Sequence, residues 1–251
     1  MMRDAELSED ALLGGAVKIL QPKAGFRAST DAVLLAAACR ADPGARVLDV
    51  GCGVGAAALC LAHRRPGVAL EGLDIQEPLV ALSRRNAARN GVGGWLAHCG
   101  DIRRPPLFVR SASYDHVLTN PPFYDAEAGP ASPSAVRDVA HRETAPLGEW
   151  LDFCLRRLKP RGGLTIIQRI ERLPEILNAL AGRAGGVRAL PLSPRRGAPA
   201  KRAVVTAVKE SRAPFTLAAP LELHLGPEGE DAAPYSEAAE AVLRRGAPLI
   251  F

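Results

Sequence analysis

The sequence predicts an α/β fold in which helices cover both faces of a mostly parallel sheet. Two observations lead to this prediction. Short apolar runs typical of buried strands alternate with longer stretches of helical periodicity along the 251-residue chain. The chain is also 47% hydrophobic and 24% charged, as expected for a globular protein with its own core. Alternation of strand and helix is typical of βαβ units, whose strands run parallel.

Seven strands are expected from the short apolar runs. They are residues 45–50, 68–73, 96–99, 114–119, 164–168, 187–190 and 203–208. Helices are expected between several of these strands, because helical periodicity begins there after glycine, proline or polar residues. They are residues 55–64, 76–90, 147–158 and 171–180.

The last two predicted strands are joined by a basic, proline-rich loop and not by a helix. We therefore expect them to form an antiparallel hairpin at one edge of the sheet. The segment Lys-Pro-Arg-Gly-Gly at 159–163 predicts a turn before the strand at 164–168. Residues 125–141, which are rich in alanine, serine and proline, predict a loop.

The residues before position 44 form a separate lead-in. A short strand is expected at 17–20, followed by a loop at 21–25 and a helix that begins at Thr30, capped by Ser29 or Thr30. We therefore divide the chain into an N-terminal extension, residues 1–43, and a main domain, residues 44–251.

Composition excludes several classes of protein. The five cysteines include no CxxC pair and the five histidines are scattered, so neither a disulfide framework nor a metal site is expected. The N-terminus, MMRDAELSED, lacks the basic start and apolar stretch of a signal peptide. No apolar run approaches the ~20 residues of a membrane helix. These features predict a cytoplasmic protein that neither binds a metal nor enters a membrane.

The net charge of +5 is distributed unevenly. Residues 183–202 contain six basic and no acidic side chains, whereas residues 214–251 contain six acidic and two basic ones. A basic stripe attracts phosphates, although a solvated basic loop explains the same pattern. The candidates for contact with a nucleic acid backbone, with two from the N-terminal segment, are Lys23, Arg27, Arg195, Arg196, Lys201 and Arg202.

A glycine-rich loop follows the first predicted strand of the main domain. The segment Asp49-Val50-Gly51-Cys52-Gly53-Val54-Gly55 allows the backbone to approach a ligand closely and leaves a helix N-terminus facing it. Asp74 lies 23 residues after Gly51, at the end of the next strand, where a carboxylate binds ribose hydroxyls. These residues predict a nucleoside cofactor. Their spacing fits both the dinucleotide fingerprint, which accepts Ala56 at its last position, and the S-adenosylmethionine loop Asp-x-Gly-x-Gly-x-Gly.

The ends of the next two strands carry further candidates. Asp101 can accept a hydrogen bond from an adenine amino group, with Ile102 packed on the ring and Ile75 following Asp74. Asn120-Pro121-Pro122-Phe123 directly follows the fourth strand. The Asn120 side-chain oxygen and the Pro121 carbonyl can each accept one N–H of a planar amine, and Phe123 offers a stacking face. Such an arrangement replaces a strong base by alignment of the nitrogen with a methyl donor.

The motifs DVGCGVG and NPPF resemble those of class I N-methyltransferases that modify planar amino or amide groups. Together with Thr30-Asp31-Ala32-Val33-Leu34-Leu35 and the segment from Pro194 to Arg202, they resemble the bacterial tRNA1(Val) adenine-37 N6-methyltransferase family over about residues 14–251. The resemblance implies a Rossmann-like sheet of seven strands, mostly parallel with an antiparallel edge hairpin. It also implies S-adenosyl-L-methionine as cofactor and tRNA as substrate.

The resemblance also assigns roles to residues. Gly51, Gly53 and Gly55 line the methionine and ribose of the cofactor, Asp74 holds the ribose and Asp101 the adenine. Asp49 is a further candidate for cofactor binding. Thr30 and Asp31 cover the methionine end, so the extension covers the cofactor site. Asn120, Pro121, Pro122 and Phe123 hold the target adenine. The family motif often has tyrosine after the prolines, whereas here Phe123 takes that place and Tyr124 follows as a substrate-binding candidate.

Three alternatives remain open at this point. The same chemistry serves a protein glutamine or a guanine N2 in ribosomal RNA, although both of those families carry large additional N-terminal domains. A nicotinamide-dependent oxidoreductase needs a catalytic Tyr-Lys pair or histidine that the sequence does not space convincingly. A catalytically silent RNA-binding module does not need the intact Asn120.

Overall fold

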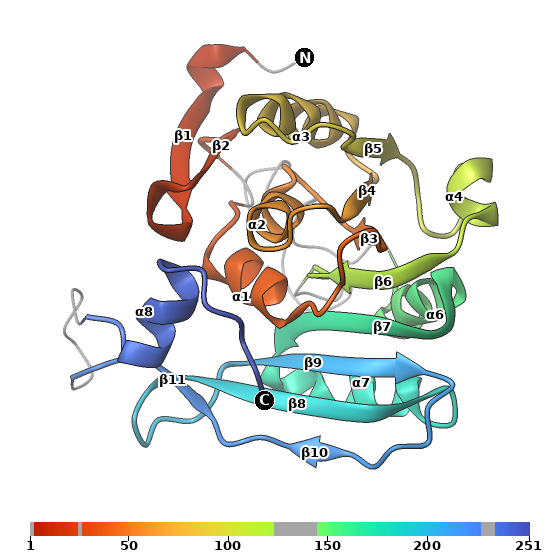
Figure 1. Ribbon diagram of the computed structural model, residues 1–251, viewed down its shortest axis with the longest axis vertical. Helices are drawn as coiled ribbons and strands as arrows, with labels where there is room; N and C mark the ends of the chain where they lie inside the picture. Colours follow the sequence, from red (N-terminus) through yellow and green to blue (C-terminus); the bar gives the residue numbers. More distant parts are fainter. Residues whose placement is uncertain (1–2, 25–26, 123–144, 227–233) are drawn as a thin grey trace, which may run out of the picture.

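The structure, a computed structural model, describes residues 3–24, 27–122, 145–226 and 234–251. Within them, a nine-stranded sheet has the order β10-β8-β9-β7-β6-β3-β4-β5, and β11 pairs with the same strand as β10, namely β8 (Figure 1). Its strands are β3 (Arg46–Val50), β4 (Ala69–Asp74), β5 (Leu96–Cys99), β6 (Tyr114–Thr119), β7 (Leu158–Arg169), β8 (Ala184–Arg195), β9 (Arg202–Lys209), β10 (Thr216–Leu217) and β11 (Leu221–His224).

The central strands run parallel, as predicted. β3 pairs in parallel with β4 on one side and with β6 on the other. Val50 at the end of β3 is level with Leu73 of β4 and Thr119 of β6. The carboxyl ends of these three strands therefore meet at one edge of the sheet, where ligands bind in open α/β folds.

The predicted antiparallel hairpin is present. The predicted number of strands is wrong, and so is the predicted position of the hairpin at the edge of the sheet. β9 is antiparallel to both β7 and β8 and lies between them. The short β10 and β11 add to β8 on its outer side, which gives nine strands and not seven. Their sequences, Thr-Leu and Leu-Glu-Leu-His, are too short to show an alternating pattern.

Helices cover both faces of the sheet through two hydrophobic clusters. Neighbouring sheet residues alternate between the clusters: Val47 faces one and Leu48 the other, as do Ile167 and Ile166. The first cluster contains side chains of α1, α2, α3 and α8, and the second contains those of α4, α6 and α7. The helices are α1 (Thr30–Ala38), α2 (Ala56–Arg64), α3 (Glu77–Arg89), α4 (Leu107–Ser111), α6 (Leu147–Arg157), α7 (Leu173–Leu180) and α8 (Glu237–Leu243).

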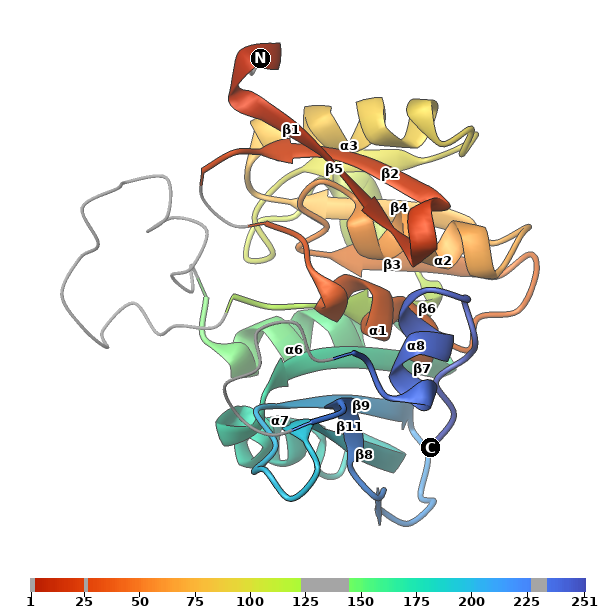
Figure 2. The same cartoon turned by 90° about the vertical axis from the view of Figure 1, so that its left-hand side faces the viewer.

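The N-terminal segment forms a two-stranded antiparallel sheet of β1 (Leu7–Leu12) and β2 (Val17–Pro22), with short 3-10 turns before and between the strands at η1 (Asp4–Glu6) and η2 (Leu13–Gly15). Both views place it beside α3 (Figures 1 and 2). The expected strand at 17–20 is present, but the first two residues of the expected loop, Gln21 and Pro22, belong to β2. Ser29 caps α1, since its Oγ accepts a hydrogen bond from the backbone of Asp31.

Asn86 of α3 and Asn90, the C-cap of α3, attach β2 to the main domain. The Asn86 side chain accepts from Leu20 N (2.8 Å) and donates to Leu20 O (2.9 Å). Asn90, one turn later, does the same with Lys18 N (2.9 Å) and Lys18 O (2.6 Å). Each side-chain amide presents one donor and one acceptor to the backbone of one β2 residue. The two amides thus make the hydrogen bonds that a neighbouring strand would make.

The turn predicted at 159–163 is an irregularity within β7. The strand already begins at Leu158, and its pairing with β6 shifts between Tyr114 and His116. Arg161 there has a φ of +64°. After β7, the turn η3 (Ile170–Arg172) leads into α7, and the loop expected at 125–141 lies outside the described residues.

All five cysteines lie in the described part of the chain and are free thiols. Cys39, Cys52, Cys60 and Cys154 are buried, whereas Cys99 at the end of β5 is exposed. Burial raises the pKa of Cys39 and of Cys60 to about 12. Across the described ranges no helix is long and apolar enough to cross a membrane.

Candidate cofactor and substrate site

The glycine-rich loop closes the carboxyl end of β3 against β4. The backbone N–H groups of Gly51 and Cys52 both donate to Leu73 O, at 2.8 and 3.1 Å. Gly51 has a φ of +75°, and a Cβ atom there would lie 3.0 Å from Cζ2 of Trp150. A side chain at position 51 is therefore disfavoured both by backbone conformation and by the indole packed over it. Gly55, with a φ of +83°, ends the loop as the N-cap of α2.

Asp74 ends β4 beside this loop. Its Oδ2 accepts from Gly53 N at 2.8 Å and its Oδ1 from Gln76 N at 2.9 Å. Burial raises its pKa, and these backbone hydrogen bonds act in the opposite direction. Each oxygen keeps acceptor capacity, so the carboxylate can also bind a pair of hydroxyl groups, as the ribose prediction requires.

Asp49 is buried one residue before the end of β3. Burial first, and then the charge of Asp74, raises the pKa of Asp49 to about 8, although the Ala58 N–H lowers it. Its Oδ2 has no partner among the described residues. A buried acceptor without a partner is costly, which marks a place where a bound donor stabilises the site.

One cavity brings several of these residues together at the ends of β3 and β6. The predicted site residues that line it are Asp49, Gly51, Gly53 and Asn120. Thr30 and Asp31 do not line it, but their neighbours Ala28, Ser29 and Ala32 do, with Leu35, Cys52, Val54, Ala56, Ala57 and Leu79. Ser29 is expected from the sequence only as a helix cap, yet it also lines the cavity.

Asn120 directly follows β6 and faces this cavity. Its Oδ1 atom is buried and has no hydrogen-bond partner among the described residues. The ends of β6 and β3 are tied together beside it, because Trp150 Nε1 donates to Thr119 Oγ1 (2.8 Å) and Thr119 donates to Val50 O (2.7 Å). Trp150 is buried, and Trp95 is partly buried against the first hydrophobic cluster. Phe123 and Tyr124 lie outside the described residues.

The carbonyl groups of Pro121 and Pro122 are both engaged. Gln168 of β7, which is fully buried, donates through Nε2 to Pro121 O and to Pro122 O, each at 3.3 Å. The Pro121 carbonyl, expected to accept an N–H of the substrate, therefore keeps one lone pair for that purpose. The sequence does not indicate Gln168, since it lies 46 residues after Pro122.

The adenine end of the predicted site follows β4 and β5. Ile75 is 43% exposed and Ile102 is half-buried. Asp101 Oδ1 accepts from Arg103 N at 2.9 Å. These three side chains lie at the carboxyl ends of neighbouring strands, because Asp74 pairs with Cys99.

Two predicted site residues from different groups form an ion pair. Arg202 Nε lies 2.7 Å from Oδ2 of the buried Asp31. Burial raises the pKa of Asp31, and Arg202 acts in the opposite direction. The pair joins the start of α1 to the start of β9, which the sequence alone did not indicate.

The other predicted RNA contacts divide into two groups. Arg27 forms an ion pair with Asp10 (2.6 Å), and Lys23 Nζ donates to Ala5 O (2.9 Å), so both hold the N-terminal hairpin together. Arg196 and Lys201 are exposed in the β8–β9 loop, and Arg195 at the end of β8 is half-buried. That loop therefore carries the accessible part of the predicted basic surface.

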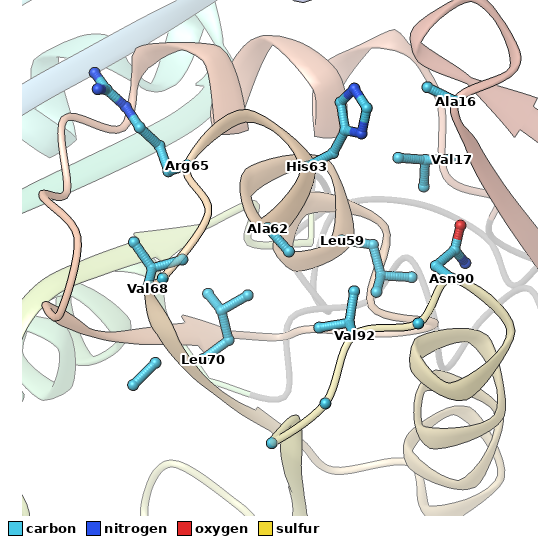
Figure 3. Close-up of a pocket in the computed structure, with 15 residues that line it drawn as sticks. Ala16, Val17, Leu59, Ala62, His63, Arg65, Val68, Leu70, Asn90 and Val92 are labelled. Atoms are coloured by element: carbon cyan, nitrogen blue, oxygen red, sulfur yellow. The ribbon is translucent and has the colours of Figure 1, made fainter.

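A second cavity, of about 500 Å³, lies at the amino end of β4, opposite the glycine loop. Figure 3 shows Leu59, Leu70 and Val92 along its floor, with the Arg65 side chain extending away from them. None of the predicted site residues lines it, and the Asn90 side chain at its rim is bonded to Lys18. In the described ranges no group of three His, Cys, Asp or Glu side chains is placed to hold a metal ion.

Comparison with known sequences gives a consistent result. A profile of the methyltransferase small domain family matches residues 28–183. A tRNA1(Val) (adenine(37)-N6)-methyltransferase from Porphyromonas gingivalis is 31% identical over 211 residues, which cover 78% of this chain and 81% of that protein. A ribosomal RNA small subunit methyltransferase C from Klebsiella pneumoniae is 38% identical over 81 residues, which cover 32% of this chain and 22% of that protein.

Solved structures share the fold. A structure described as a predicted O-methyltransferase from Agrobacterium tumefaciens has a TM-score of 0.70 at 24% identity, covering 87% of this chain and 98% of that one. TrmN from Thermus thermophilus has a TM-score of 0.50 at 23% identity, covering 72% of this chain and 48% of that one. At these identities the likeness concerns the fold alone.

Proposed function

Because the chain belongs to the methyltransferase small domain family and has tRNA1(Val) (adenine(37)-N6)-methyltransferases among its relatives, we propose that it methylates N6 of a tRNA adenine, at a position of the 37 type. The resemblance predicted from the sequence is confirmed by these relatives. The chain is an S-adenosylmethionine-dependent N-methyltransferase with a Rossmann-like sheet. The substrate and the position are the proposal.

The observation that carries the proposal is the buried Oδ1 of Asn120, which has no hydrogen-bond partner among the described residues, at the cavity of the glycine loop. An exocyclic amine on an aromatic ring has its lone pair delocalised and is a poor nucleophile. When Asn120 Oδ1 accepts one N–H and Pro121 O the other, the nitrogen is oriented with its lone pair toward the methyl donor. Alignment of this kind accelerates transfer without a strong base.

The residues of the cavity, together with those at the neighbouring ends of β4 and β5, fit S-adenosylmethionine. We assign the ribose to Asp74, whose oxygens keep acceptor capacity, the adenine to Asp101 with Ile75 and Ile102, and the methionine end to the glycine loop with Asp49. When bound, the cofactor supplies a methyl group activated by a sulfonium charge. We also propose that residues 1–43 cover this site, since Ala28 and Ser29 of that segment line the cavity.

A tRNA substrate is supported by charge at the same end of the sheet. Arg196 and Lys201 are exposed in the loop between β8 and β9. A phosphate backbone is attracted to such side chains whatever its sequence. A loop adenine is a suitable target because it leaves its stack at low cost before entering a pocket.

The test is methyl transfer from radiolabelled S-adenosylmethionine to separate pools of unmodified tRNA, ribosomal RNA and protein. We expect label in tRNA as N6-methyladenosine, reduced about 100-fold or more by Asn120→Ala. Asn178→Ala, at an exposed asparagine of α7, is the matched control and keeps full activity. Label only in protein or ribosomal RNA would overturn the substrate. Cofactor binding without label in any pool would favour a silent RNA-binding module.

A further inference from the structure

We propose that Gln168 is a positioning residue for methyl transfer, which holds the Asn120-Pro121-Pro122 segment so that Asn120 faces the substrate amine. The inference rests on the proposed N-methyltransferase function. It concerns a side chain on β7 that the sequence motifs do not include. Gln168 acts through the motif and need not touch either substrate.

Both N–H groups of the Gln168 side-chain amide donate hydrogen bonds. Nε2 donates to Pro121 O and to Pro122 O, both at 3.3 Å, while Oε1 accepts from Arg169 N at 2.8 Å. Two donors and one acceptor on a single side chain are available only from asparagine and glutamine. The side chain is fully buried, so water cannot replace it.

The need for this side chain follows from the two prolines. The pairing of β6 with β7 ends at Thr119 and Ile166, and beyond it β7 continues along β9, with Gln168 level with Ala203. Pro121 and Pro122 have no N–H group, so they cannot donate to β7 in a regular ladder. The Gln168 side chain replaces the missing backbone pairing and fixes both carbonyls against the sheet.

Fixing the carbonyls also fixes Asn120. Asn120 lies between the end of β6, anchored through Thr119 to Val50, and Pro121, anchored to Gln168. Its Oδ1 is thereby held at the cavity without any hydrogen bond of its own among the described residues. A displacement of the reacting groups by about 1 Å can lower a rate by 100-fold. Loss of the Gln168 donors should therefore lower kcat more than it weakens cofactor binding.

Two variants separate positioning from stability. Gln168→Met has similar length and no donor. Gln168→Glu keeps the shape, donates to one carbonyl when protonated and to neither when ionised. Thr165→Val is the control, because it removes another buried side-chain hydrogen bond of β7, that with His116, away from the motif.

The experiment measures kcat, the KM for unmodified tRNA and the Kd for S-adenosylmethionine, below the Tm of each variant. We expect Gln168→Met to lower kcat 10-fold to 100-fold with the cofactor Kd within about twofold. Relative to wild type, Gln168→Glu should regain activity as pH falls, while Thr165→Val keeps the wild-type kcat at every pH. If Gln168→Met behaves like Thr165→Val, the inference is wrong even though the wild type methylates tRNA. If the wild type methylates another planar amine, the proposed substrate is wrong, and the same kcat comparison on that amine decides the role of Gln168.

Discussion

Gly51 of the cofactor loop is constrained both by its positive φ and by its packing against Trp150. Gly51→Ala places a Cβ 3.0 Å from Trp150 Cζ2 at a φ of +75°. We expect a loss of about 1–3 kcal/mol in the free energy of unfolding and a weaker affinity for S-adenosylmethionine. Denaturant unfolding and calorimetric titration measure the two effects.

Gly44→Ala is the matched control for Gly51. Its φ is +83°, but a Cβ there meets nothing within 4 Å, and the residue lies before β3 at the opposite end of the strand. It should lose stability from backbone strain and keep the cofactor affinity. Equal affinities for the two variants would mean that the Trp150 contact does not shape the cofactor loop.

The Asp49 carboxyl group makes the stability of the cofactor-free protein depend on pH. Its pKa is raised from 3.8 to about 8, by burial first and by Asp74 next. Between about pH 4 and pH 8 the folded protein holds a proton on Asp49 that the unfolded chain has lost. The contribution of this proton to the free energy of unfolding is therefore complete below about pH 4 and is lost as pH rises through 8. We therefore expect Asp49→Asn to gain stability relative to wild type between pH 5 and pH 9, by about 1 kcal/mol or more.

Thermal unfolding of both proteins at pH 5 and pH 9 checks the Asp49 prediction. The informative quantity is the difference in Tm between variant and wild type at each pH. A difference that stays constant with pH would show that Asp49 does not titrate in this range in the folded protein.

The attachment of β2 to α3 through asparagines gives a prediction for a whole element. Asn86 is fully buried and bonds Leu20 N and O as well as Val54 O of the cofactor loop (3.0 Å). Asn86→Ala leaves buried backbone groups unpaired, so we expect a loss of about 2–4 kcal/mol in the free energy of unfolding. Asn90→Ala should cost less than half of that, because water can reach the exposed Lys18 backbone. Denaturant unfolding of both variants provides the comparison, and equal losses would argue against the role of burial.

The sequence predicted the central elements well because their own residues determine them. Leu96–Cys99 and Tyr114–Thr119 form strands with the predicted bounds, since their apolar runs are short and clearly ended. β1 was missed because its sequence, LSEDAL, carries acids in place of an apolar pattern, and these acids pair with Arg27 and Arg89. The latter pairing joins residues 80 apart, which local periodicity cannot reveal. α8 was also not predicted, although Ser236 is a residue type that favours a helix N-cap and its side chain accepts a hydrogen bond from Ala239 N.

The candidate site was predictable where a motif lies at a strand end. Gly51, Asp74 and Asn120 are brought to one edge because parallel strands β3, β4 and β6 end level with one another. Gln168 and the Asp31–Arg202 pair were not predictable, because each contact joins segments that are distant in sequence. The sheet order decides such contacts, and the sequence indicates that order only through the family resemblance.

For the molecule as a whole, the net charge of +5 and the exposed basic β8–β9 loop predict binding of tRNA that depends on salt. The logarithm of the affinity should fall linearly with the logarithm of salt concentration. Replacing Arg196 and Lys201 together by alanine should lower the magnitude of this slope by about 2. Filter binding at salt concentrations from about 50 to about 200 mM measures this slope. Arg65→Ala, at the cavity of Figure 3, together with Lys18→Ala, at an exposed residue of β2, is the control of equal charge. If both double variants show the same dependence of affinity on salt, the tRNA does not bind at the β8–β9 loop.

The unequal burial of the cysteines gives the protein a natural attachment point for a reporter. Four thiols are buried, while Cys99 is exposed and donates to Ile75 O at 3.6 Å, beside the proposed adenine pocket. Because reagents reach only accessible thiols, a maleimide dye should modify the native protein once, at Cys99. S-adenosylmethionine should slow that modification in proportion to its occupancy. The wild-type chain then reports cofactor binding by fluorescence without any engineered residue, and Cys99→Ser should abolish the signal.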